Sequence, residues 1–290
     1  MHSAPSWRAN SSRSSSCLNF SAGSQATIRQ SISATTLSLV SAWPFLDHEG
    51  PIPIAHRGGA AEGPENTMAA FSAAIDLGYR YLETDVHATR DGVLVAFHDE
   101  GLQRLSGRPE AIAELAWRDL ETVRVGGGHA IPRFEELLEA WPDVRIAVDP
   151  KHDQATEPLI DALLQADAID RVCVGSFSGR RLATARRLGG PRLCTGLSPK
   201  EVGQLQAAAA GVPTRVKAGA CAQVPPKAKG VPLVHQRFVD AAHTQGLAVH
   251  VWTIDDADEM HRLLDLGVDG IMTDRPTVLR DVLMARGTWL

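Results

Sequence analysis

Residues 51–78 read PIPIAHRGGAAEGPENTMAAFSAAIDLG and contain one complete strand followed by one complete helix. Pro51–His56 is a short apolar run of the kind that forms a buried strand, and two glycines follow it closely. Glu65–Leu77 then repeats apolar side chains at helical spacing, and Gly78 supplies a C-terminal stop. The apolar face of this helix consists of Met68, Phe71 and Ile75. The stretch therefore predicts one βα unit.

The same alternation continues to the end of the chain. Short apolar runs precede amphipathic segments, a pattern typical of βα units and a parallel sheet. Asp91-Gly92 adds a hairpin turn after the second strand, and prolines interrupt residues 212–234, where we expect one strand near Gly219–Val224. The eight strand centres are Ile52, Tyr81, Val144, Val172, Leu193, Cys221, Val249 and Ile271. Eight units favour an α/β fold closed as a (β/α)8 TIM barrel over an open doubly wound sheet.

The chain length also favours one barrel preceded by a tail. A barrel of about 250 residues fits 290 residues better than two domains do. We expect a barrel domain at residues 51–286 and a disordered or extended tail at residues 1–45. The first 33 residues are rich in serine and contain no acid, a composition that organellar transit peptides share. The apolar patch at residues 36–46 is followed by no A-x-A-like cleavage site, so a secretory signal is as weakly supported as a transit peptide, and we prefer a disordered start.

Charge and cysteine content exclude several classes of function. The net charge of -5 argues against a nucleic-acid binder, which would carry a basic excess. No apolar run approaches the ~20 residues of a spanning helix, so we expect no insertion into a membrane. The four cysteines lie far apart and form no CxxC pair, which predicts a reduced, cytoplasmic protein. They are Cys17, Cys173, Cys194 and Cys221.

Acidic side chains end the second and third predicted strands. Glu83 and Asp85 are two residues apart on a strand, so both carboxylates point to one face, near the mouth of the barrel. Like charges at one buried site need a compensating cation or shared proton, and Mg²⁺ or Ca²⁺ suits carboxylate ligands. Asp149 adds a third oxygen donor on the neighbouring strand. The alternative to a metal site is that Glu83 and Asp85 are ordinary surface carboxylates at a strand end. Lys151, on the same face as Asp149, meets either a phosphate oxygen or these carboxylates.

Two histidines follow predicted strands and are candidates for proton transfer. His56 and His98 have side chains that give or take a proton near neutral pH, so together they allow an acid and a base in one turnover. A structural role is the alternative for each. Arg57 offers a planar donor fork for phosphate, or an ion pair with Glu83 or Glu65. The remaining histidines are expected to be solvated or packing residues: His87, His129, His152, His235, His243, His250 and His261.

These residues belong to motifs that follow one another in a specific order. The motifs are HRG (56–58), ENT (65–67), ETDV (83–86), HD (98–99), and VWT (251–253) with GVDGIMTDRP (267–276). Each motif alone is weak, but their order and spacing resemble those of the glycerophosphodiester phosphodiesterase family over roughly Pro51 to Arg286. The resemblance implies a TIM-barrel enzyme that hydrolyses glycerophosphodiesters, such as glycerophosphocholine or glycerophosphoethanolamine, to glycerol 3-phosphate and an alcohol. The expected partner is therefore a small molecule, and the expected assembly a monomer or homodimer.

The resemblance also implies roles for single positions. His56 and His98 would be the general acid and base, and Glu83 and Asp85 ligands of a divalent cation, Mg²⁺ or Ca²⁺. Arg57 would contact the phosphate, and Glu65 would lie close to the metal. Trp252 would form an apolar wall for the glycerol or head group. For Trp252 the alternative is an aromatic residue of the barrel core.

The third metal ligand departs from the family pattern. The family has a Glu-x-Lys motif, whereas this sequence has Asp149-Pro150-Lys151, which shortens the ligand by one methylene. The implied reaction places the cation, Arg57 and Lys151 where negative charge develops on the phosphoryl oxygens. One histidine deprotonates water or the neighbouring glycerol hydroxyl, the latter giving a cyclic phosphate, and the other protonates the leaving alkoxide.

Two other functions remain compatible with the sequence. A phospholipase D-like relative would act on a phospholipid or sphingolipid, although no basic or aromatic amphipathic segment predicts docking on a membrane. A catalytically silent barrel would only bind phosphorylated ligands, but no histidine or acid of the motifs is missing. A phosphodiesterase that acts on small glycerophosphodiesters is our prediction.

Overall fold

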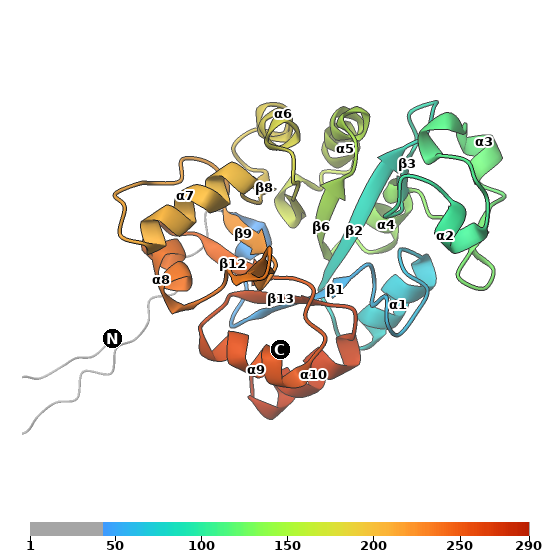
Figure 1. The fold of residues 1–290 in the computed structure, drawn as a ribbon. Coiled ribbons are helices and arrows are strands. Elements are labelled where there is room, and N and C mark those ends of the chain that lie inside the picture. The colour runs from blue at the N-terminus through green and yellow to red at the C-terminus, as the bar shows by residue number, and fades with distance from the viewer. Residues whose placement is uncertain (1–42, 290) are drawn as a thin grey trace, which may run out of the picture. The chain divides into compact units, whose positions relative to one another are not determined.

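Parallel strands form the centre of the computed structural model, which describes residues 43–289. The barrel strands are β1 (Ile52–His56), β2 (Tyr81–Ala88), β6 (Arg145–Pro150), β7 (Val172–Val174), β8 (Cys194–Thr195), β9 (Cys221–Val224), β12 (Ala248–Val251) and β13 (Gly270–Thr273). Their spatial order is β8-β7-β6-β2-β1-β13-β12-β9, so neighbours in the sheet are also successive barrel strands of the chain. The helices lie outside these strands (Figure 1). The predicted (β/α)8 barrel is confirmed.

The two ends of the sheet meet between β8 and β9. Gly196 and Cys221 form a parallel bridge. The Leu197 N–H donates to the Cys221 carbonyl at 3.0 Å, and the Ala220 N–H donates to the Thr195 carbonyl at 2.8 Å. The ring therefore closes at the place where β8 contributes only two residues.

The long helices cover the barrel. They are α1 (Met68–Asp76), α4 (Phe134–Ala140), α5 (Asp153–Gln165), α6 (Gly179–Gly189), α7 (Pro199–Ala209), α8 (Gln236–Thr244), α9 (Ala257–Asp265) and α10 (Pro276–Ala285). The helix expected over Glu65–Leu77 begins later, at Met68, because the Thr67 hydroxyl accepts from the Ala70 N–H at 3.2 Å and caps it. Sequence spacing thus identified the helix but not its first turn.

Two adjacent aspartates precede α9, and only the second caps it. Asp256 accepts from the Glu259 N–H at 2.9 Å and fills the N-cap position. Asp255 instead accepts from the Asp274 N–H at 2.8 Å and from the Thr273 hydroxyl at 3.0 Å. Two adjacent aspartates are both good caps, so only the tertiary contact to β13 distinguishes them.

A long insertion separates β2 from α4. The predicted hairpin is present, because β3 (Leu94–Ala96) pairs antiparallel with the end of β2. The other elements of the insertion are α2 (Gln103–Ser106), η2 (Ile112–Glu114), α3 (Trp117–Leu120), β4 (Arg124–Val125) and β5 (His129–Ala130). It has a hydrophobic cluster of its own, formed by Val95, Phe97, Leu102, Ile112, Leu120, Val123, Val125 and Ile131. The insertion therefore packs as a small body beside the barrel.

The remaining short elements lie at the edges of the fold. They are η1 (Pro44–Leu46), η3 (Ile169–Arg171) and the antiparallel pair β10 (Lys227–Ala228) and β11 (Val231–Pro232). Most of the tail predicted at residues 1–45 lies outside the described residues. Within residues 43–289, no helix has both the length and the apolar character that crossing a membrane requires.

The barrel interior is apolar at one end and acidic at the other. Ile52, Ile54 and Tyr81 fill the apolar end, and the Tyr81 hydroxyl donates to the Phe45 carbonyl of η1 at 2.9 Å. Inward residues alternate along β2, so Tyr81 is followed by Glu83 and then by Asp85 toward the C-terminal end of the strand. The fold thus collects its acidic side chains at the end where active sites of TIM barrels form.

Candidate active site

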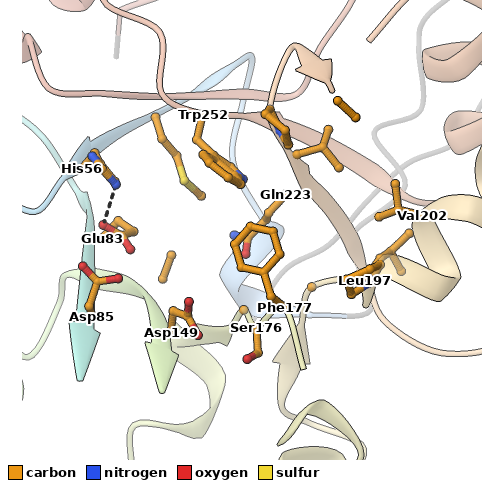
Figure 2. A pocket seen from close by; sticks show the side chains of 18 of the residues that line it. His56, Glu83, Asp85, Asp149, Ser176, Phe177, Leu197, Val202, Gln223 and Trp252 are labelled. Atoms are coloured by element: carbon orange, nitrogen blue, oxygen red, sulfur yellow. Dashed lines mark ion pairs between the residues drawn. The ribbon is translucent and has the colours of Figure 1, made fainter. Parts of the chain in front are cut away.

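A cavity of about 590 Å³ opens at the C-terminal ends of the strands (Figure 2). Eight of the nine predicted site residues line it: His56, Arg57, Glu83, Asp85, His98, Asp149, Lys151 and Trp252. They come from β1, β2, β6, the segment after β3 and the segment after β12. The structure therefore brings together residues that are up to 196 positions apart in the sequence.

Three carboxylates lie side by side in this cavity. Glu83 and Asp85 are 8% and 2% exposed, and Asp149 is the direct register partner of Asp85. Burial, together with the nearby Asp85 charge, raises the pKa of Glu83 to about 7. Burial likewise raises the pKa of Asp149. These shifts reflect first the burial of the carboxylates, and second their closeness to Asp85.

The same carboxylates fit a hard divalent cation. Asp85 Oδ2 and Asp149 Oδ1 are buried and have no hydrogen-bond partner. Carboxylate oxygens on neighbouring strands are the ligands that Mg²⁺ and Ca²⁺ prefer. Arg57 Nε lies 3.2 Å from Asp85 Oδ2 without an aligned hydrogen bond, so this oxygen still has an open position.

Lys151 makes the ion pair that the sequence left as its alternative role. Its Nζ lies 2.5 Å from Asp85 Oδ1 and 3.2 Å from Asp149 Oδ2. Burial lowers the pKa of Lys151, but the two carboxylates outweigh that effect and the net shift is upward. Lys151 is therefore a protonated cation at the floor of the cavity, and its ammonium is available to a phosphate there.

His56 is held by a carboxylate on each side. Its Nδ1 lies 2.7 Å from Asp274 Oδ1, and its Nε2 lies 3.7 Å from Glu83 Oε2. Burial lowers the pKa of His56, but Glu83 and then Asp274 raise it, and the net shift is upward. Sequence analysis included Asp274 only as part of the GVDGIMTDRP motif. Its place directly after β13, the parallel neighbour of β1, was the signal that it meets His56.

His98 reaches the cavity from the insertion. Its Nδ1 lies 2.7 Å from Asp99 Oδ1, and its side chain is 35% exposed. A hydrogen bond from Arg104 lowers the pKa of Asp99 to about 2, which keeps this carboxylate charged. His98 thus has a carboxylate behind one ring nitrogen, as His56 has.

A buried histidine fixes the segment that carries His98. His87 Nε2 donates to the His98 carbonyl at 3.1 Å, and burial lowers the pKa of His87 to about 4. It is therefore neutral and acts as a packing residue, which is one of the two roles expected for it. Its contact ties the insertion to β2 next to the site.

Glu65 is engaged by two arginines. Arg104 donates to both of its oxygens at 2.7 Å, and Arg57 donates to Oε1 at 3.3 Å. Burial raises the pKa of Glu65, but these arginines outweigh it and the net shift is downward. Glu65 does not line the cavity, and the structure links it to Arg57 as the sequence allowed. Its role near a metal stays a prediction.

An apolar wall faces the acidic group (Figure 2). The rings of Trp252 and Phe177 meet edge to face, with centroids 5.7 Å apart. Leu197 and Val202 continue this surface, and the Phe177 side chain is 68% exposed. Trp252 therefore lines the cavity as predicted. Sequence analysis missed Phe177, although an aromatic residue just after a barrel strand was a usable signal.

Comparison with known proteins identifies the family. The chain matches the family model described as the glycerophosphoryl diester phosphodiesterase family over residues 56–278. Probable glycerophosphodiester phosphodiesterase 2 of Mycobacterium tuberculosis is 44% identical over 254 residues, which cover 84% of this chain and 95% of that protein. Human lysophospholipase D is 28% identical over 271 residues, which cover 79% and 85% of the two chains.

A solved structure supports the same fold. A phosphodiesterase from Oleispira antarctica in complex with the product sn-glycerol 3-phosphate aligns with a TM-score of 0.68 at 22% identity. The alignment covers 81% of this chain and 97% of that one. Because the family match spans most of the barrel and a relative is 44% identical over nearly its whole length, the chain belongs to the glycerophosphoryl diester phosphodiesterase family, a family of phosphoric diester hydrolases.

Proposed function

We propose that this protein hydrolyses small glycerophosphodiesters, such as glycerophosphocholine and glycerophosphoethanolamine, to glycerol 3-phosphate and an alcohol. The observation that carries the proposal is that two histidines backed by carboxylates line one cavity with a buried acidic group. The working part would be the barrel at residues 51–286, as a monomer or homodimer in the cytoplasm.

The residues present would divide the work between metal binding and proton transfer. Glu83, Asp85 and Asp149 would hold Mg²⁺ or Ca²⁺, with Glu65 close by through its arginine contacts. The bound cation would supply positive charge to the phosphoryl oxygens. Arg57 and Lys151 would bind the same oxygens, each exchanging part of its present ion pair for phosphate.

Proton transfer would be shared by His56 and His98. Each has Nδ1 against a carboxylate, and a carboxylate only accepts, so Nδ1 carries the proton and Nε2 remains for chemistry. One histidine would remove the proton of water or of the neighbouring glycerol hydroxyl. The other would protonate the leaving alkoxide.

The test is a coupled assay for glycerol 3-phosphate release, run with and without chelator. We expect turnover that chelator abolishes and Mg²⁺ or Ca²⁺ restores. His56→Ala and His98→Ala should lose activity while still binding metal, and Glu83→Gln should weaken metal binding. Wild-type rates in either histidine variant would remove that residue from the mechanism. Binding of glycerol 3-phosphate without any turnover would instead support a silent barrel.

The apolar wall supports a second candidate substrate. Trp252, Phe177 and Leu197 form a surface beside the acidic group that a lysophospholipid chain would bury. One relative is named a lysophospholipase D. Comparing kcat/KM for lysophosphatidylcholine and for glycerophosphocholine decides between them. A higher value for the acylated substrate would favour the lipid.

A further inference from the structure

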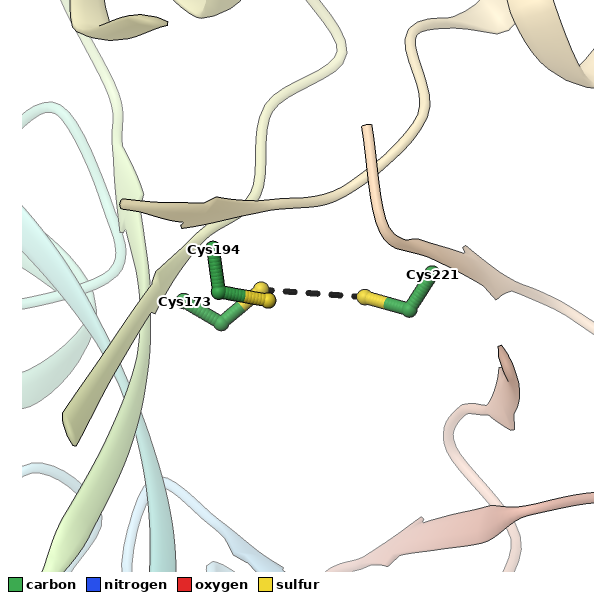
Figure 3. A group of neighbouring side chains, drawn as sticks. All are labelled: Cys173, Cys194 and Cys221. Carbon is green, nitrogen blue, oxygen red and sulfur yellow. Dashed lines mark hydrogen bonds between the residues drawn. The ribbon is translucent and has the colours of Figure 1, made fainter. Parts of the chain in front are cut away.

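Three cysteines that are far apart in the sequence meet inside the barrel (Figure 3). Cys173 lies on β7, Cys194 on β8 and Cys221 on β9, and their sulfur atoms all lie within 4.8 Å of one another. The Cys173 and Cys221 sulfurs are 3.7 Å apart. All three residues are at most 1% exposed. The spacing of these cysteines in the sequence therefore gave no sign that three of them meet in space.

A buried histidine lies on the strand next to that of Cys221. His250 lies on β12, the parallel neighbour of β9, and is 0% exposed. Neither of its ring nitrogens has a hydrogen-bond partner. Its place two residues after Ala248, the register partner of Cys221, puts it beside the cysteine cluster. A buried imidazole with two unpaired nitrogens is costly and needs an explanation, such as a ligand.

We propose that Cys173, Cys194 and Cys221 bind one structural zinc ion and that His250 turns toward it as the fourth ligand. Zn–S bonds of about 2.3 Å in a tetrahedron place the sulfurs about 3.8 Å apart, close to the spacing of Cys173 and Cys221. Binding releases three thiol protons to solvent and uses the neutral imidazole, and no electron is transferred. Four protein ligands leave no open position, so the ion holds structure and does not take part in hydrolysis.

The position of the cluster gives the ion a structural purpose. The four donors come from β7, β8, β9 and β12, which include the place where the ring closes through few hydrogen bonds. A metal there would join the two ends of the sheet.

Ligand chemistry separates this site from the acidic cavity. Thiolates select zinc and other soft ions, whereas the carboxylates at the barrel mouth select Mg²⁺ or Ca²⁺. Loss of the zinc site and loss of the proposed hydrolysis are therefore distinguishable. The zinc site is read out by metal content and spectroscopy, not by activity.

The test uses the full chain purified without a histidine tag. We expect about one zinc per chain by elemental analysis after dialysis, and thiolate-to-cobalt charge-transfer bands when Co²⁺ replaces it. Cys221→Ser and His250→Ala should lose the zinc. Cys17→Ser is the matched control and should keep it. Glu83→Gln should also keep it, because that carboxylate belongs to the other site.

Several results would overturn the proposal. A wild-type protein that contains no zinc and gives no charge-transfer bands with added Co²⁺ would do so, even where the cysteine variants fail to fold. An intact mass lower by two hydrogens would show a disulfide in place of a metal site. Equal zinc loss in Cys17→Ser and Cys221→Ser would mean that the metal is bound elsewhere.

Discussion

Replacing Asp274 by Asn tests how the site positions His56. Asp274 Oδ1 lies 2.7 Å from His56 Nδ1, and its own N–H donates to Asp255 Oδ1 at 2.8 Å, which fixes its place at the end of β13. The carboxylate holds the imidazole with Nε2 toward the cavity. Asparagine keeps the shape of the side chain and removes its charge, so the change acts on the proton and orientation of His56.

The size of the effect follows from this one hydrogen bond. A hydrogen bond to a charged group contributes about 1.5–3 kcal/mol, which corresponds to a loss of roughly 10- to 150-fold in kcat/KM. The pKa of His56 is lowered by burial but raised more strongly by Glu83 and Asp274, for a net upward shift. Without the Asp274 charge this pKa falls. The limb of the pH profile that reports His56 should therefore move to lower pH, whichever role the histidine has.

The assay is kcat/KM for glycerol 3-phosphate release, measured across pH for the wild type and Asp274→Asn. Asp281→Asn is the matched control, because it makes the same charge change at an exposed residue that pairs with Arg280. Thermal unfolding of both variants checks that they are folded. A kcat/KM within about twofold of wild type, with an unmoved pH profile, would refute the role given to Asp274.

Three further substitutions test the fold and the apolar wall. Gly58→Ala should destabilise the protein by about 1–3 kcal/mol in urea unfolding, because φ is +80° and the new Cβ would lie 2.9 Å from Ala70. Gly92→Ala, at φ +87° in open space, should lower the free energy of unfolding by less. Tyr79→Phe should lower the unfolding free energy by about 1 kcal/mol, since the buried hydroxyl donates to a carbonyl of α10. Phe177→Ala should leave the free energy of unfolding within about 0.5 kcal/mol of the wild-type value, because the residue is 68% exposed. The same change should raise KM for an acylated substrate. An unchanged KM would argue against the lipid candidate.

Patterns that repeat along one element carried most of the sequence prediction. Alternation along β2 placed Glu83 and Asp85 on one face, and the strand count placed Asp149 beside them. The Asp-Gly turn gave the hairpin that leads to His98. These features depend on local geometry, so a single sequence contains them.

Contacts between elements could not be predicted in the same way. Arg104 reaches Glu65 from an irregular insertion, and no periodicity marks its direction. Asp255 and Asp256 differ only in which one meets β13. The meeting of Cys173 with Cys221 depends on how the ring closes, which is a property of the whole sheet. Such pairs become visible only when strands distant in the sequence are placed side by side.

The insertion between β2 and α4 divides the proposed acid and base between two packing units. His56 is fixed by the barrel, whereas His98 belongs to a segment with a separate hydrophobic cluster that includes Phe97. The distance between the two imidazoles therefore depends on how the insertion packs against the barrel. In the proposed mechanism, a change in how the insertion packs would move His98 relative to His56, whereas Lys151, which would bind the phosphate, would stay with the barrel.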